Sequence, residues 1–370
     1  MKFVEWRSRK GMSLLGLIRV NAAYYYCRHC RSGHKPWEHV LQLKSAKLTA
    51  AAEEIVAMAG VEHSFAGCAE RTLRKMSGLR LSESTVERIT EAAGQRVRRQ
   101  IEKGKSLGPT CDWQWQRDAF GKRCAYISVD ATGVRQQGLR GSHAEGRMAY
   151  VGMVYNPRSK HDSQRPTPHQ VRYLSGLFAL DELGCQLQNE ALEVGLATAD
   201  RQIALSDGGN GLENFFKQFF PKAVCILDFW HAKEYIVELG KLLHDDESTR
   251  KAWISDLCHR LKHEGGPAVR RCLEELDLGS ASAKTREEHR KTVQYFRNHE
   301  HRMDYPTYVR NGWQIGSGPV ESACKTVVGN RLKGGGMRWG EEGTDAVCHL
   351  RGLYLSEPAC WESFWNPPPN

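Results

Sequence analysis

The pattern of apolar and polar positions begins with a helical region. Apolar residues recur at helical spacing in Thr49–Ala59, in Ser64–Met76 and in a segment that opens at Ser82. Ser and Thr side chains before an apolar series are good helix caps, and Gly78 marks the short turn between the last two segments. This spacing predicts a helix-turn-helix-like DNA-binding domain over residues 46–107, with an ordinary three-helix packing unit as the alternative.

After Gly108-Pro109 the pattern changes to short apolar runs that alternate with helical stretches. Such alternation predicts an α/β fold. The expected strands are Cys124–Asp130, Met148–Tyr155, Gln202–Asp207 and Ala223–Asp228, with helices at about His169–Val194 and Leu212–Phe219.

The last third of the chain returns to helical spacing. Residues from Phe229 to about Pro306 are charged and carry no strand signal, which predicts an all-α insertion. A further helix is expected to open near Pro319, because proline suits the first helical position. That helix would carry Glu321, Lys325 and Val328 along one face.

Composition adds information about partners. The chain has 370 residues, and 53 Lys and Arg against 43 Asp and Glu give a formal net charge of +10. An excess of this size favours polyanionic partners such as nucleic acid. No segment is long and apolar enough for a membrane span, and Met12–Ile18 is too short for a convincing signal peptide. Twelve scattered cysteines indicate reduced thiols in the cytoplasm rather than a disulfide scaffold.

Cys27 and Cys30 form a C-x-x-C pair within the first 45 residues. Such a pair is half of a tetrahedral Zn²⁺ site and predicts a zinc-knuckle-like segment, but two reduced structural cysteines explain it about equally well. Further ligands would have to come from His29, His34, His39 or Cys68, or from a longer parent chain.

Three acidic residues are the candidate catalytic groups. Asp130 and Asp207 each follow an apolar strand and precede a glycine-containing turn, and Glu321 is expected at the third position of its helix. Ligands bind beyond the carboxyl ends of strands in open α/β sheets, and carboxylates are the usual protein ligands of Mg²⁺. Singly, an Asp at a strand end is more often a turn or cap residue than a ligand, and a Glu at the third helical position is more often a capping partner. Together they predict a two-metal phosphoryl-transfer site.

Longer motifs surround these acids, and they resemble those of bacterial insertion-sequence transposases of the ISKra type, within the Mutator-like DDE group. The resemblance spans about Tyr24 to Trp365. It rests on Ser128-Val-Asp130-Ala-Thr-Gly133, Ser206-Asp207-Gly208-Gly209, Asp228-Phe-Trp-His231, Trp313-Gln-Ile-Gly-Ser-Gly-Pro-Val-Glu321-Ser-Ala-Cys-Lys325 and Arg331-Leu-Lys-Gly-Gly-Gly-Met-Arg338-Trp339.

The resemblance implies a ribonuclease-H-like core in which Asp130, Asp207 and Glu321 form the catalytic triad and hold Mg²⁺ or Mn²⁺. It implies cleavage and strand transfer at terminal inverted repeats of double-stranded DNA, by at least a homodimer. The implied parts are a zinc-knuckle-like segment (1–45), the helix-turn-helix-like domain (46–107), the first part of the core (120–229), the helical insertion (230–310), the helix with the catalytic Glu (311–340) and a C-terminal helix and tail (341–370).

Two departures and two alternatives accompany this interpretation. Many relatives carry a further C-x-x-C before Cys27, and Gly209-Asn210-Gly211 stands where an acidic or aromatic residue is more usual. The alternatives are a catalytically inactive or truncated DNA-binding protein derived from a transposase, and a ribonuclease-H-like nuclease that does not transpose.

Further residues are candidates for supporting roles. Asp228 is the rival of Asp207 as second ligand, and Asp207 is preferred because glycines after it permit close approach of DNA. His231 orients a phosphate or forms a structural pair with Asp228. Trp313 and Trp339 stack on a base or pack in the core. Contacts with DNA phosphates are expected from Lys325, Arg331, Lys333 and Arg338, for which a solvated helix face is the alternative.

Overall fold

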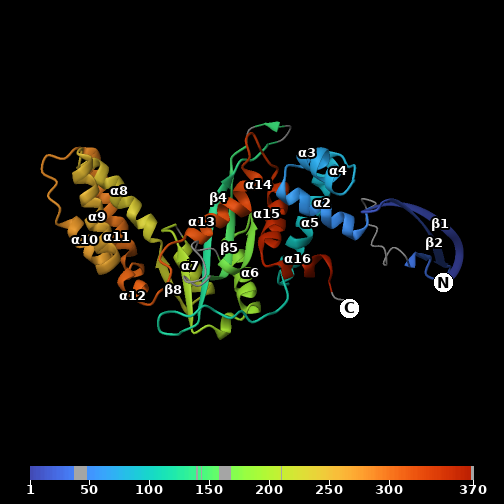
Figure 1. Ribbon diagram of the computed structural model, residues 1–370, viewed down its shortest axis with the longest axis horizontal. Helices are drawn as coiled ribbons and strands as arrows, with labels where there is room; N and C mark the ends of the chain where they lie inside the picture. Colours follow the sequence, from blue (N-terminus) through green and yellow to red (C-terminus); the bar gives the residue numbers. More distant parts are fainter. Residues whose placement is uncertain (37–47, 139–140, 143, 158–167, 210, 368–370) are drawn as a thin grey trace.

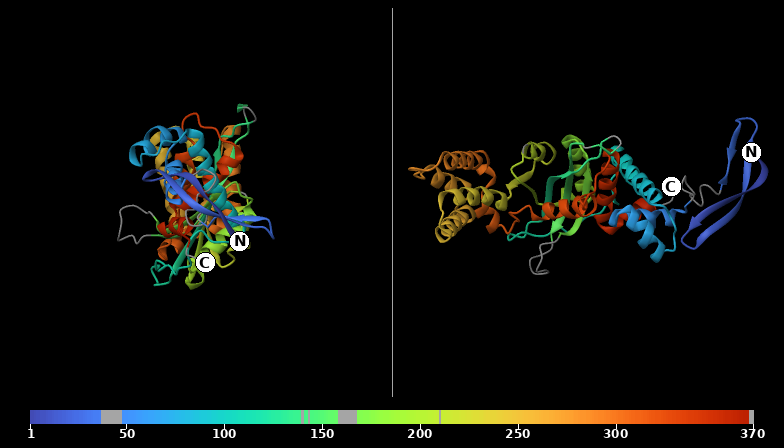
Figure 2. Two further views of the ribbon diagram at one scale, coloured as in Figure 1. Left: turned by 90° about the vertical axis from the view of Figure 1, so that its right-hand side faces the viewer. Right: turned by 90° about the horizontal axis from the view of Figure 1, so that it is seen from above.

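The computed structural model describes residues 1–36, 48–138, 141–142, 144–157, 168–209 and 211–367. The molecule is elongated, with a small N-terminal sheet at one end, a mixed sheet in the middle and a group of helices at the other end (Figures 1 and 2). The predicted catalytic residues Asp130, Asp207 and Glu321 lie in the middle part, whereas Cys27 and Cys30 lie in the N-terminal part.

The central sheet has five strands and confirms the α/β class. Its strands lie in the order β6-β5-β4-β7-β8. The neighbours β4, β5 and β6 are antiparallel, whereas β7 runs parallel to both β4 and β8. The strands are β4 (Cys124–Val134), β5 (Arg147–Pro157), β6 (Pro168–Gly176), β7 (Arg201–Ser206) and β8 (Ala223–Leu227).

The strand β6 corrects one prediction, because a helix was expected from about His169. Only the second part of that segment is helical, as α6 (Leu180–Glu193). Arg172 obscures the strand pattern, since it occupies an inward position and is fully buried. Its guanidinium is satisfied there by Glu190 at 3.2 Å and Glu357 at 2.8 Å.

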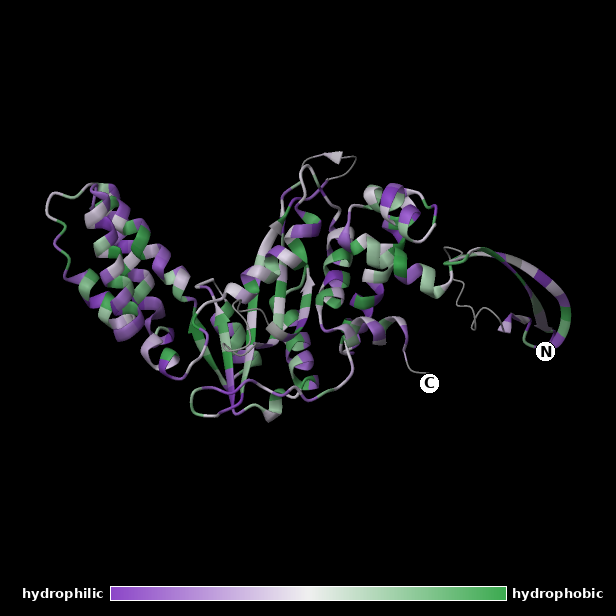
Figure 3. Ribbon diagram, in the orientation of Figure 1, coloured by the Kyte–Doolittle hydropathy of each residue, from purple (hydrophilic) through white to green (hydrophobic). Residues whose placement is uncertain are grey.

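Helices cover both faces of this sheet, and alternate residues of β4 serve the two faces. Ile127 and Val129 belong to the hydrophobic cluster that includes α6 and α7 (Leu212–Phe219). Tyr126 belongs to the other cluster, with residues of α8 (Phe229–Leu243) and α13 (Gly318–Ala323). The strands are correspondingly green in the hydropathy view of Figure 3. Asp130 has the same parity as Tyr126 and so faces α13.

The helices predicted near the N-terminus are present. Thr49 caps α2 (Ala50–Glu62) and Ser82 caps α5 (Glu83–Glu102). They pack against the long, buried helix α15 (Glu341–Leu355), and Gly94 makes that packing possible because a Cβ there would meet the Ala346 carbonyl oxygen at 1.9 Å. Between α2 and α5 lie α3 (Phe65–Gly67), η1 (Cys68–Thr72) and α4 (Leu73–Met76), and α16 (Pro358–Trp365) ends the described chain.

The segment expected to be an all-α insertion is helical. It leaves the sheet after β8 and returns to it before α13 (Figure 1). Besides α8 it contains α9 (Glu247–Glu264), α10 (Gly266–Glu274), α11 (Ala283–His299), η4 (Glu300–Arg302) and α12 (Tyr305–Arg310). Outside the insertion, the short turn η3 (Leu196–Thr198) precedes β7.

The N-terminal segment contains strands that were not predicted. β1 (Lys2–Ser13) and β2 (Gly16–Cys27) form a long antiparallel hairpin, and β3 (Ser32–His34) pairs with the end of β2. Met12–Ile18 is the tip of this hairpin. All twelve cysteines are free thiols. Among the described residues, no helix combines the length and apolar character needed to cross a membrane.

Candidate active site

Asp130 lies within β4 rather than at its end, which corrects the predicted boundary. Pairing of β4 with β7 stops at Ser128 and Leu205, whereas pairing with β5 continues through Asp130 and Val151 to the end of β4. The β7 side of β4 is therefore open beside Asp130. The Asp130 carboxylate itself accepts the next backbone N–H, from Ala131, at 2.7 Å.

Asp207 directly follows β7 and so lies beside this opening. Its Oδ1 accepts a hydrogen bond from the Gly209 N–H at 2.9 Å, and the residue is half-buried. The carboxylates of Asp130 and Asp207 thus come from adjacent parallel strands, as their positions in the sequence predict.

Glu321 comes from α13, which packs against β4 and β5. Ser317 stands at the N-cap position without a side-chain capping bond, and the helix begins one residue earlier than predicted, so Glu321 is its fourth residue rather than its third. The Ser317 hydroxyl lies 2.8 Å from Glu321 Oε1 and 2.8 Å from Asp228 Oδ2. Since a hydroxyl has one hydrogen, it donates to one carboxyl at a time, and both contacts hold together only when one carboxyl is protonated.

The charges of the three acids act on one another. Burial raises the pKa of Asp130, and the charges of Asp207 and Glu321 raise it further. The Ala131 N–H and the Cys324 thiol oppose this rise by donating hydrogen bonds to the carboxylate. Asp130, Asp207 and Glu321 therefore form one electrostatic group.

The donor chemistry of this group suits a hard divalent cation, because carboxylate oxygens are the ligands that Mg²⁺ prefers. The spacing is wider than a metal site requires. Within the part of the chain that the structure describes, no three Asp, Glu, His or Cys side chains come close enough to hold one ion.

Asp228, the rival second ligand, is enclosed by protein. It is 1% exposed, and its carboxylate caps α8 by accepting the Trp230 N–H at 2.9 Å. Burial raises its pKa, and the charge of Glu321 adds to this effect. Its partner is Ser317 rather than His231, which lies 3.4 Å from Glu234 instead. Asp228 is thus built to position Ser317 and Glu321, whereas Asp207 is the more accessible carboxylate.

Gly208 serves a contact within the protein. A Cβ at this position would lie 3.0 Å from the ring of Tyr295, which stacks on Tyr235 with centroids 3.8 Å apart. Both tyrosines belong to the helical insertion. The absence of a side chain at Gly208 thus accommodates Tyr295 of the helical insertion.

The four cations assigned to phosphate contacts divide into two kinds. Lys325, Lys333 and Arg338 are exposed, and the Lys333 ammonium donates to the hydroxyl of Thr132, two residues after Asp130. Arg331 is only 2% exposed, so its predicted contact with phosphate is replaced by a packing role. Its guanidinium packs against both Phe65 and Trp339, at 4.4 and 4.8 Å from the ring centroids.

The backbone explains this division. A π-helical turn, η5 (Cys324–Gly329), followed by α14 (Asn330–Leu332), changes the side-chain periodicity after α13. Val328 consequently points into the core, while Lys325 and Glu321 are exposed. The expectation that all three share one face is therefore wrong.

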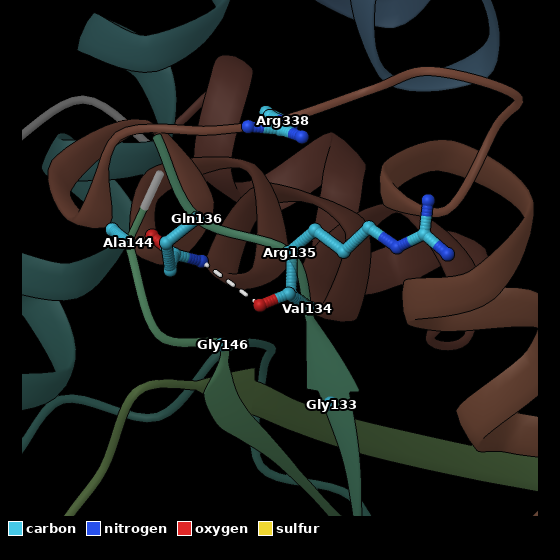
Figure 4. Close-up of a pocket in the computed structure, with 7 residues that line it drawn as sticks. All are labelled: Gly133, Val134, Arg135, Gln136, Ala144, Gly146 and Arg338. Atoms are coloured by element: carbon cyan, nitrogen blue, oxygen red, sulfur yellow. Dashed lines mark hydrogen bonds between the residues drawn. The ribbon is translucent and has the colours of Figure 1, made fainter. Parts of the chain in front are cut away.

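A pocket of about 470 Å³ lies beyond Asp130, at the end of β4 (Figure 4). The glycine-rich segment Arg331–Trp339 is attached to the end of β4 beside this pocket. The Trp339 N–H donates to the Arg135 carbonyl at 3.2 Å, and the Gln137 N–H donates to the Trp339 carbonyl at 2.8 Å. In Figure 4 the Arg135 side chain extends away from Ala144. The lining residues are Gly133, Val134, Arg135, Gln136, Ala144, Gly146 and Arg338.

The tryptophans considered for base stacking are both in the core. Trp313 and Trp339 are each 8% exposed. The Trp313 indole donates to Asp118 at 3.2 Å and lies parallel to Tyr308, while Trp339 donates to the Leu332 carbonyl at 3.1 Å. The packing alternative therefore describes both residues.

In the region predicted to be helix-turn-helix-like, some of the basic side chains form ion pairs within the protein. Arg96 pairs with Glu53, and Arg98 pairs with Asp345 at 2.7 Å. Four exposed cations before α5 are left as candidate phosphate contacts: Arg71, Arg74, Lys75 and Arg80.

Cys27 and Cys30 lie at the two ends of the turn between β2 and β3. A hydrogen bond from the Ser32 hydroxyl, assisted by Cys27, lowers the pKa of Cys30 to about 7. His39, one of the residues considered as a further ligand, lies outside the described residues. No third His, Cys, Asp or Glu joins the pair within the described ranges.

Three contributors to the site were not assigned from the sequence: Ser317, Cys324 and Trp230. All three stand inside the motifs quoted above, but their hydrogen bonds and exposure depend on the packing of α8, α13 and η5. In comparisons with protein-family models and with curated proteins, the chain matches none.

Proposed function

We propose that this chain is a metal-dependent enzyme that acts on phosphodiester bonds of nucleic acid. The observation that carries the proposal is the placement of Asp130 and Asp207 on adjacent parallel strands with Glu321 on the helix packed against them, close enough for their charges to raise the pKa of Asp130. Carboxylates grouped in this way at the open edge of a sheet suit phosphoryl transfer.

Within that class, the particular proposal is a DDE transposase of an insertion sequence, of the ISKra type that the motifs resemble. A mixed five-stranded sheet with helices on both faces is compatible with the ribonuclease-H-like core that this resemblance implies. The proposed substrates are the terminal inverted repeats and target DNA, bound by at least a homodimer in the cytoplasm. We also propose that Cys27 and Cys30 contribute to a Zn²⁺ site.

The residues of the chain have distinct parts in the proposed reaction. Mg²⁺ or Mn²⁺ held by the triad would activate water or a 3′-hydroxyl for in-line attack on a phosphodiester. Ser317 orients Glu321 while Asp228 fixes Ser317, and the Ala131 N–H with the Cys324 thiol holds Asp130.

Exposed cations supply the phosphate contacts. Lys333 lies beside Thr132, and Arg338 lines the pocket at the end of β4. The pocket begins three to four residues beyond Asp130, which is about 10–13 Å along the strand. A duplex lying along β4 would therefore meet these cations a few base pairs from the phosphate at the triad.

The experiment that tests the proposal is nicking and strand transfer of a DNA fragment that carries the element's ends, with Mg²⁺ or Mn²⁺. We expect metal-dependent products from the unaltered chain and none from Asp207→Ala or Glu321→Ala. Asp181→Ala, which removes an exposed carboxylate at the start of α6, is the matched control and should retain activity.

The second candidate is a DNA-binding protein without catalysis. The observation that favours it is that no three acidic, His or Cys side chains among the described residues converge on a common ion position. Specific binding to the ends without any product would support this candidate. Cleavage without strand transfer would instead indicate a ribonuclease-H-like nuclease.

A further inference from the structure

Trp230 is an exposed aromatic residue at the entrance to the candidate active site. It is 57% exposed, whereas Trp113, Trp115, Trp313 and Trp339 are each at most 8% exposed. Large aromatic side chains are normally among the first to be buried in a core. Trp6 of the N-terminal hairpin is exposed as well, so exposure alone does not distinguish Trp230. Trp230 differs from Trp6 because it lies beside Gly316, in the segment that leads into α13 and Glu321.

The indole is held rigidly in place. It packs against the backbone before α13, where a Cβ on Gly316 would lie 3.0 Å from its Cδ1 atom and 3.6 Å from the Asp228 carboxylate. The Phe229 ring meets it edge-on with centroids 5.6 Å apart, and the Phe229 N–H donates to the Ile315 carbonyl. Trp230 is thus fixed between α8 and the segment that carries Glu321.

One cation lies beside the indole. The Lys233 ammonium lies 5.0 Å from the centroid of the ring, and the side chain of His231 is 40% exposed on the same helix. An aromatic surface with an adjacent cation suits a base with its phosphate, because every base has a π-face and the cation contacts the backbone.

We propose that Trp230 is a stacking platform for an unpaired nucleobase next to the phosphodiester at Asp130, Asp207 and Glu321. This inference rests on the proposed function, because it takes nucleic acid as the substrate of that site. It assigns to Trp230 the base-stacking role that the sequence analysis considered for Trp313 and Trp339. Trp230 then positions the substrate by holding a base out of the duplex as its phosphate approaches the carboxylates.

The test compares two fluorescent DNA probes of one sequence, one fully paired and one with three unpaired nucleotides at its end. Affinity is measured by anisotropy with Ca²⁺ in place of Mg²⁺, so that the readout is binding rather than cleavage. We expect Trp230→Ala to weaken binding of the unpaired probe about tenfold and binding of the paired probe less than about twofold. Trp230→Phe should restore most of the affinity.

The controls separate stacking from folding. Phe120→Ala removes another exposed aromatic side chain, 64% exposed in the loop before β4, and should change neither affinity. An abasic nucleotide at the stacked position should erase the difference between the unaltered chain and Trp230→Ala. Equal weakening of both probes, or no weakening of the unpaired one, would overturn the stacking role. Failure of the unaltered chain to bind either probe would overturn the proposed function as well.

Discussion

The central sheet and the N-terminal sheet use the same kinds of residue in opposite surroundings. In β4, β5 and β7 the apolar side chains are enclosed by helices on both faces, whereas the hairpin of β1 and β2 leaves Phe3, Trp6 and Leu15 in solvent. Because the side chains of the central sheet are enclosed, the stability that each one contributes depends on its packing against its neighbours. In the hairpin, backbone pairing holds the strands together with little help from a core.

Deleting a large side chain is the strongest way to test this difference. Phe216 of α7 is fully buried against the central sheet, and Leu15 at the hairpin tip is 97% exposed. We expect Phe216→Ala to lower the free energy of unfolding by about 4 kcal/mol through lost burial and a cavity. Leu15→Ala should change it by less than about 0.5 kcal/mol. Urea titration followed by tryptophan fluorescence measures both, and similar losses would contradict the contrast.

An arginine stacked on an aromatic ring occurs in both regions and gives a more specific comparison. Arg331 is buried against Phe65 and Trp339, whereas Arg7 lies 3.7 Å from the ring centroid of Tyr24 on an exposed strand. We expect Arg331→Ala to cost about 3 kcal/mol of unfolding free energy, since packing and a desolvated cation–π contact are lost together.

Arg7→Ala should cost about 0.5 kcal/mol, because solvent screens both its stacking and its ion pair with Glu5. The same urea titrations apply. Lys333→Ala is a useful second control, since this exposed cation lies two residues after Arg331 and should affect DNA affinity more than stability. A large loss of stability in Arg7→Ala would show that the hairpin depends on side-chain packing after all.

Cysteine reactivity distinguishes the two regions by pH. In the hairpin region the Ser32 hydroxyl and Cys27 lower the pKa of Cys30 to about 7, whereas burial raises the pKa of Cys324 beside Asp130. The Cys30 thiolate therefore accumulates as the pH rises through about 7, and that of Cys324 stays scarce across the neutral range.

Alkylation by iodoacetamide, quantified by mass spectrometry, should reach half its maximal rate near pH 7 for Cys30. Cys324 should react slowly throughout. A Cys30 rate that still climbs steeply at pH 8.5, the ordinary thiol value of about 8.5, would contradict the lowered pKa. Ser32→Ala should move the midpoint upward.

The same contrast explains what the sequence could predict. Buried strands are visible in the sequence as apolar runs. The sequence therefore predicted β4, β5, β7 and β8, and placed Asp130 and Asp207 close to where the structure has them. β6 was missed because the inward position of Arg172 breaks its pattern. The hairpin of β1 and β2 was missed because its strands are exposed, and exposed strands lack the apolar run that marks a buried strand.

Within the candidate site, the sequence supplied the candidate residues but could not predict their orientation. The motif around Glu321 gave the acid and the cations that follow it. The π-helical turn η5 then decides which of these face solvent, and this is why Arg331 lies in the core while Lys325 and Lys333 do not. Ser317 and Cys324 could be assigned only once α13 was seen to pack against β4.

The smallest expected effect concerns the hydrogen bond between the Cys324 thiol and Asp130. Burial raises the pKa of Asp130 and the thiol partly offsets that rise, so removing the thiol should raise the pKa further. The proposed activity needs Asp130 as a carboxylate, and activity therefore falls as the pH falls through this pKa. In Cys324→Ala the acidic limb of the pH–rate profile should shift to higher pH, with the rate on the plateau nearly unchanged. Cys324→Ser keeps a donor and should restore the original profile. A shift to lower pH, or equal shifts in both variants, would show that the thiol does not hold Asp130 in its ionised form.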